Sequence, residues 1–257
     1  MGRARPDHPG AGVTPGGTGV LGAMTWPDVA QRCAGSLLVV PLGATEQHGP
    51  HLPLATDTEV ARALADGLAS RRAGVLVAPA LPYGSSGEHA AFAGTISIGA
   101  DALERVVVEL VRSADAFSGV VLVSGHGGNT VPLARAVQVL EDEGRSVLAW
   151  SPRADLLGAA ARMSGWGDPD AHAGWVETSL LLCIRPDAVR TERSEAGDLR
   201  PLGDIADELR RHGVGAVSPN GVLGDPRQAD LARGQAILQL LVDDLHGSVA
   251  HRFGAAS

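Results

Sequence analysis

Three side chains that could bind a metal lie within twelve residues of one another, directly after an apolar run. The segment GATEQHGPHLPLATD (43–57) contains Glu46, His48 and Asp57, and it follows SLLVV. Side chains two positions apart in an extended segment point the same way, so Glu46 and His48 should face one cavity. The intervening loop contains two prolines and is long enough to bring Asp57 back to the strand end.

Two further motifs carry the same kinds of side chain. SGHGGN (124–129) contains His126, and HAGWVETS (172–179) contains His172 and Glu177. Carboxylate oxygens and imidazole nitrogens together form a ligand set for Zn, Mn or Fe(II). The sequence therefore indicates a divalent-metal site built from several separate segments.

Each of these residues also has a simpler interpretation. Asp57 precedes a helical pattern and could be its N-cap, and Glu177 could be a solvated helix residue. A histidine at a strand end is often an ordinary hydrogen-bonded polar residue. GHGGN is not a dinucleotide-binding loop, because Thr130 stands where G-x-G-x-x-G requires glycine. His51 and His89 are expected to lie around the site and not to ligate.

Strands and helices must alternate to position these motifs. The apolar runs predict four short buried strands, and helical periodicity predicts several amphipathic helices between and after them. Asp101 is a candidate N-cap and Gly144 a candidate C-terminal cap. The predicted strands are 36–43, 73–79, 119–125 and 145–151, and the predicted helices are 58–71, 101–117, 130–144 and 228–250. The periodicity of 175–184 is ambiguous, and a helix is favoured there.

Alternation of this kind predicts an α/β fold, with a mostly parallel sheet and helices on both faces. In such sheets, sites form beyond the carboxyl ends of the strands, which is where two of the polar motifs fall. Residues 1–22 are rich in glycine and proline and are expected to be a disordered tail. Residues 23–257 are expected to form a single domain, with an irregular excursion over 186–227.

Composition argues against several classes of function. The net charge is −8, and no Lys/Arg run suggests a nucleic-acid partner. No apolar run approaches the roughly 18 residues that span a membrane. Two widely separated cysteines, Cys33 and Cys183, are not a disulfide framework and fit a reducing cytoplasm.

Taken in order, E-x-H-x8-D, G-H-G-G-N and H-A-G-x-x-E-T-S resemble the creatininase family of metal-dependent amidohydrolases, over residues 36–250. The resemblance implies a three-layer sandwich with two divalent ions per subunit, either Fe(II), Zn or Mn. It also implies a ring-shaped homo-oligomer, such as a hexamer.

The resemblance assigns roles to the candidate ligands. Glu46 and His126 would hold one ion, His48 would hold the other, and Asp57 would bridge them. Creatininase has a glutamate ligand two residues after the third-strand histidine, where this chain has Gly128. We expect Glu177 to replace it. Glu59 is the rival, but it should face away from the site.

Two features are expected to act on the substrate. His172 is the candidate general acid for the leaving nitrogen, and its alternative role is to hydrogen-bond the ligands. The Gly/Ser-rich segment YGSSGEHAAFAG (83–94) is expected to contact substrate through Ser85, Ser86 and His89.

Within the family, the whole pattern resembles members that act on a modified precursor peptide. They remove its C-terminal, Val–Tyr-derived residue. Gly127 and Gly128 agree with a pocket wide enough for a peptide. Hydrolysis of a small cyclic amide or a formamide is the first alternative, and a non-catalytic scaffold subunit is the second.

Overall fold

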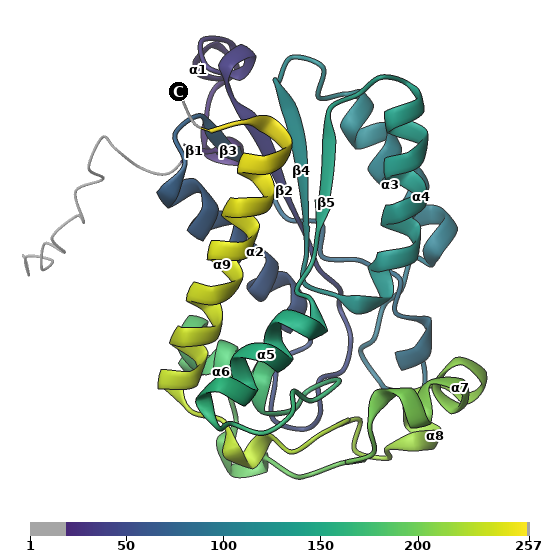
Figure 1. The fold of residues 1–257 in the computed structure, drawn as a ribbon. Helices are drawn as coiled ribbons and strands as arrows, with labels where there is room; N and C mark the ends of the chain where they lie inside the picture. Colours follow the sequence, from purple (N-terminus) through teal and green to yellow (C-terminus); the bar gives the residue numbers. More distant parts are fainter. Residues whose placement is uncertain (1–18, 256–257) are drawn as a thin grey trace, which may run out of the picture.

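A parallel five-stranded sheet forms the centre of the molecule (Figure 1). The computed structural model describes residues 19–255. The strand order is β1-β3-β2-β4-β5, and every neighbouring pair is parallel. The strands are β1 (Gly19–Val20), β2 (Leu37–Leu42), β3 (Val75–Val77), β4 (Gly119–Ser124) and β5 (Val147–Trp150).

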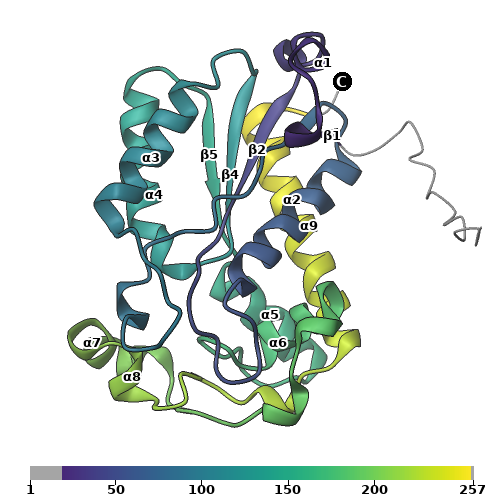
Figure 2. The same ribbon diagram turned by 180° about the vertical axis from the view of Figure 1, so that it is seen from behind.

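Helices cover both faces of this sheet, and the two faces have separate cores (Figures 1 and 2). Alternation along β4 divides them, because Val121 and Val123 enter one core while Val120 and Leu122 enter the other. The predicted three-layer α/β sandwich is therefore confirmed. The first face carries α2 (Thr56–Arg71), α5 (Ala154–Ser164), α6 (Trp175–Ile184) and α9 (Leu231–Phe253), and the second carries α3 (Ala100–Arg112) and α4 (Thr130–Asp142).

The boundaries differ from the sequence expectation in several places. Gly19–Val20 pairs with β3 as an edge strand, so the expected tail is wrong for residues 19–22. A strand this short forms only through pairing with a distant segment, which local composition does not reveal. Residues 1–18 of that expected tail lie outside the described residues.

The expected cap of α3 also differs from the structure. The N-cap of α3 is Gly99, with φ 78°, and not Asp101.

The region predicted to be irregular, 186–227, contains two helices. They are α7 (Leu202–His212) and α8 (Val214–Val217), and both contact the 3-10 turn η3 (Gly87–His89). Helix α5 was not predicted, whereas α6 has the predicted bounds. Within 19–255, no helix is both long and apolar enough to cross a membrane.

The sheet register brings the polar motifs together. Leu42 at the end of β2 pairs with Ser124 at the end of β4. The segments that follow these two residues therefore leave the same edge of the sheet side by side. One of them leads to Glu46 and His48, and the other leads to His126.

Candidate metal centre

The loop after β2 folds back on itself as predicted. The Glu46 N–H donates to the Leu54 carbonyl at 3.1 Å, and His48 forms an antiparallel bridge with Leu52. This return places Asp57 in the first turn of α2. Asp57 is not the N-cap of that helix, because the N-cap is Ala55. Its side chain is free to turn toward the site.

Asp57 lies between two histidines that come from different strand ends. Its Oδ1 is 3.0 Å from Nε2 of His48, and its Oδ2 is 3.3 Å from Nδ1 of His126. The Nε2 of His126 lies 3.2 Å from Oε2 of Glu46. These four side chains are at most 6 % exposed, so this part of the centre is deeply buried.

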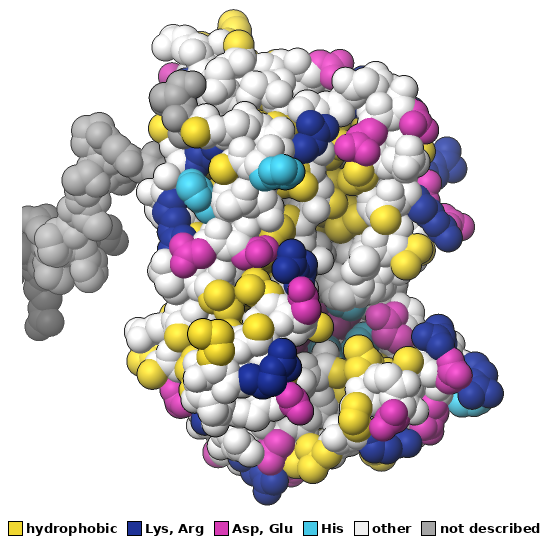
Figure 3. Space-filling view, in the orientation of Figure 1, with side chains coloured by type: hydrophobic (Ala, Val, Ile, Leu, Met, Phe, Trp, Pro, Cys, Tyr) yellow, Lys and Arg dark blue, Asp and Glu magenta, His cyan; other side chains and the backbone are white. Residues whose placement is uncertain are grey.

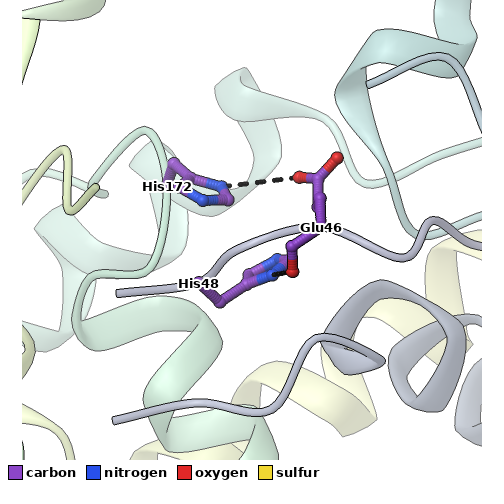
Figure 4. Close-up of side chains that lie close together, drawn as sticks. All are labelled: Glu46, His48 and His172. Atoms are coloured by element: carbon purple, nitrogen blue, oxygen red, sulfur yellow. Dashed lines mark hydrogen bonds and ion pairs between the residues drawn. The ribbon is translucent and has the colours of Figure 1, made fainter. Parts of the chain in front are cut away.

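Glu177 and His172 reach the same centre from the start of α6. The Glu177 Oε2 lies 3.9 Å from the Nε2 of His48, and the Nδ1 of His172 lies 4.0 Å from Oε1 of Glu46 (Figure 4). Ala173, between them, has φ 52°, which costs a non-glycine residue about 1–2 kcal/mol. That conformation lets the Ala173 N–H donate to Glu177 Oε2 at 2.6 Å.

The potential ligand atoms fall into overlapping groups of three. Asp57 belongs to two of them, one with Glu46 and His126 and one with His48 and Glu177. A third group joins Glu46, His48 and His172. The first two groups contain the ligands predicted for the two ion sites, with Asp57 common to both.

The buried carboxylates lack partners that a metal would supply. Among the described residues, no hydrogen bond reaches either carboxylate oxygen of Glu46 or the Oδ2 of Asp57. A buried, unsatisfied carboxylate oxygen is costly, whereas a divalent cation satisfies it directly. The donor set of carboxylates and imidazoles therefore fits a pair of divalent ions.

The electrostatics show where positive charge is required. Burial raises the pKa of Glu46 to about 8, and the negative charge of Asp57 adds to this. Burial opposes charge on His48, but the charge of Asp57 and a hydrogen bond from His48 to it raise the pKa of His48 to about 10. Burial also opposes charge on His126, but its close contact with Asp57 raises the pKa of His126 to about 9. Metal ions would displace these protons on binding.

Gly128 has no room for a side chain. A Cβ there would overlap the Ser85 carbonyl and the His126 ring, and would lie 2.8 Å from Oε1 of Glu88. A carboxylate ligand on this residue is thus excluded by packing. The structure instead brings Glu177 to His48 and Asp57, while Glu59 pairs with Arg185 at 3.3 Å.

The predicted substrate loop lies against the centre. The Ser85 carbonyl is 3.0 Å from Nε2 of His126, and the Ser86 hydroxyl is 3.4 Å from it. His89 is 4 % exposed, and its Nε2 is 3.3 Å from Oε1 of Glu46. The structure thus brings all three residues to the centre, and substrate contact by them stays a prediction.

Two residues near the centre were missed by the sequence reasoning. Gln47 lies buried between two predicted ligands, and Glu88 has its Oε1 3.9 Å from Nε2 of His126. Their positions next to Glu46, His48 and His89 were the available signal. The Glu88 side chain is partly exposed. A hollow beside the α7–α8 lobe has histidine and acidic side chains at its floor (Figure 3).

Comparison with known proteins places this geometry in a family. The model of the family described as "Creatininase: Creatinine amidohydrolase" matches residues 22–249. The chain belongs to the creatininase family. This confirms the resemblance identified from the motifs, and with it a fold built for metal-dependent hydrolysis of amide bonds.

Curated relatives and a solved structure of this family are similar to the chain over most of its length. The mycofactocin precursor peptide peptidase of Mycobacterium ulcerans (strain Agy99) is 45% identical over 88% of this chain and 86% of its own. The protein of the same name from Mycobacterium tuberculosis (strain ATCC 25618 / H37Rv) is 48% identical over 83% and 84%. The structure "Creatininase Mn" has a TM-score of 0.79 at 26% identity, covering 92% of this chain and 99% of that one.

Replacement of Glu177 by glutamine should remove one of the two ions. The substitution keeps the shape but removes the charge that, with His48 and Asp57, completes one ligand group. We expect Glu177→Gln to bind about one metal per chain and to be inactive, by elemental analysis and an amide-hydrolysis assay. Glu59→Gln is the matched control and should bind two. Two ions retained in Glu177→Gln would show that the second site is built differently.

Proposed function

We propose that this chain is the metal-dependent peptidase that acts on the mycofactocin precursor peptide. It would release the C-terminal Val–Tyr-derived residue of the modified peptide by hydrolysing one amide bond. The observation that carries this proposal is the shared Asp57, which joins two groups of potential metal ligands. The 45–48% identity to relatives with that named substrate supports the choice of peptide.

Two divalent ions, Fe(II), Zn or Mn, are proposed as cofactors. Glu46, Asp57 and His126 would hold one, and His48, Asp57 and Glu177 would hold the other. When bound, such ions polarise an amide carbonyl and lower the pKa of water toward neutrality. The buried carboxylates would hold both ions in a site shielded from bulk solvent.

His172 is proposed to carry the proton from water to the leaving nitrogen. Its Nε2 lies 2.9 Å from the Gln47 carbonyl, which can only accept, so Nε2 carries the proton and Nδ1 is bare. The Nδ1 faces the carboxylates of Glu46 and Glu177, each at 4.0 Å. Burial, helped by the charge of His48, holds the pKa of His172 well below its usual value.

The role of His172 is therefore that of a base first and an acid second. As a new C–O bond forms at the carbonyl carbon, Nδ1 takes the proton that water loses. As the C–N bond breaks, the same proton passes to the departing amine. This refines the role of general acid that the sequence suggested, because the resting imidazole has no proton on the nitrogen that faces the site.

The rim of the site has space for a substrate larger than creatinine. A side chain at Gly127 would meet no atom within 4 Å, so the surface beside His126 is open. Glu88 adds a partly exposed carboxylate at the same rim. An open rim supports a peptide substrate over a small cyclic amide.

A substrate panel with metal control tests the proposed activity. The metal-loaded protein should release the C-terminal residue of the modified peptide, as followed by mass spectrometry, and should leave creatinine and formamides intact. A chelator should abolish the cleavage, and Mn, Zn or Fe(II) should restore it. Faster turnover of creatinine or a formamide would favour the alternative substrates, and full activity without metal would contradict the mechanism.

Replacement of His172 separates proton transfer from metal binding. His172→Ala should lower kcat about 10²–10⁴-fold, because the leaving amine loses its proton donor. Metal content should stay near two ions per chain. The exposed His212 on α7 offers the control His212→Ala, which should leave kcat unchanged. Loss of an ion from His172→Ala would make this residue a ligand.

We also propose that the protein forms a homo-oligomer and is located in the cytoplasm. The family resemblance supports the first and the two widely spaced cysteines support the second. Sedimentation of the purified protein measures the assembly directly.

A further inference from the structure

The side chain of Gln47 is buried among four segments that surround the metal centre. The Gly49 N–H lies 2.8 Å from Oε1 of Gln47, and because an N–H can only donate, this contact fixes which end of the amide is oxygen. The Nε2 of Gln47 lies 3.0 Å from the Gly221 carbonyl. It also lies 2.9 Å from Nδ1 of His89 and 3.1 Å from Nε2 of His172.

The amide has two hydrogens for these three neighbours. The Gly221 carbonyl takes one, because it can only accept. His172 does not take the other, because its Nε2 carries a proton that is donated to the main-chain carbonyl of Gln47. The second hydrogen therefore goes to Nδ1 of His89, which must be an unprotonated acceptor.

This assignment determines what His89 presents to the metal centre. A neutral imidazole with a bare Nδ1 has its proton on Nε2. The Nε2 lies 3.3 Å from Oε1 of Glu46, a buried oxygen that is not hydrogen-bonded within the described chain. The protonated Nε2 thus lies within ion-pair distance of the carboxylate, whereas the other tautomer would leave a bare nitrogen beside it.

The surrounding backbone holds the amide in place. Gly221 has φ 80°, and a side chain there would overlap Oε1 of Gln47, so this segment packs directly against the amide. The same segment pairs with the backbone of His172 through Leu223. Rotation of the Gln47 amide would break its bond from Gly49 and its bond to Gly221 together.

We propose that Gln47 is a positioning residue that fixes the tautomer of His89, and that His89 thereby orients Glu46 for one of the two ions. This rests on the proposed pair of ion sites and adds a relay, Gln47 to His89 to Glu46, that serves only the site containing Glu46. The site formed by His48, Asp57 and Glu177 does not depend on it. Loss of a residue that supports a metal ligand from behind typically lowers metal affinity about 10–100-fold.

The test is a calorimetric titration of metal-depleted protein with Mn²⁺. Gln47→Met keeps the length of the side chain but offers His89 no N–H. The variant should lower the affinity for one of the two ions about 10–100-fold and leave the affinity for the other unchanged. The exposed Gln138 on α4 provides the control Gln138→Met, which should bind both ions as the wild type does. Equal weakening of both ions, or no weakening, would overturn the proposal.

A second variant distinguishes the relay from a general packing role. His89→Gln places an amide N–H beside Glu46, and that N–H does not depend on residue 47. In the His89→Gln background, Gln47→Met should therefore lower the metal affinity by less than about twofold. If Gln47→Met lowers the metal affinity as much in the His89→Gln background as in the wild type, the relay is contradicted. If the wild-type protein itself binds fewer than two ions, the proposed centre fails, and the result is distinct from failure of the relay.

Discussion

Two carboxylates, Glu46 and Asp57, are buried side by side, and the balance of their charge is the constraint on which the rest of the structure depends. Desolvation and mutual repulsion both oppose two negative charges in a site that is at most 6 % exposed. In the absence of metal, protons on His48 and His126 provide the opposing charge. No hydrogen bond from residues 19–255 reaches the Glu46 oxygens or the Oδ2 of Asp57, and divalent ions would supply the opposing charge there instead.

The scaffold brings these charges together by parallel pairing. Pairing of Leu42 with Ser124 places two strand ends in adjacent positions, so Glu46 and His126 meet although 80 positions separate them in the chain (126 − 46). Two local features of the backbone bring further groups to the site. The left-handed conformation of Ala173 gives an N–H to Glu177, and absence of a side chain at Gly128 lets the Ser85 carbonyl reach His126. The positive φ of Ala173 is a strained conformation, and strain of this kind is commonly found at functional sites.

Much of this could be read from the sequence, because apolar periodicity and motif order are local signals. The α/β fold, helix α6 and the convergence of Glu46, His48, Asp57, His126, His172 and Glu177 were all predicted. The edge strand Gly19–Val20 and the helices α7 and α8 were not, because their stability comes from contacts with distant segments. Gln47 was missed for a related reason, since its importance lies in which atoms of His89, His172 and Gly221 surround it.

We propose that Asp57 is shared between two ions, one held with Glu46 and His126 and the other with His48 and Glu177. Anomalous diffraction from crystals of the Mn-loaded protein tests it most directly. The account predicts two manganese peaks, one on each side of the Asp57 carboxylate, with Glu177 bound to the ion next to His48. A single peak, or a second ion without Glu177 among its ligands, would contradict it.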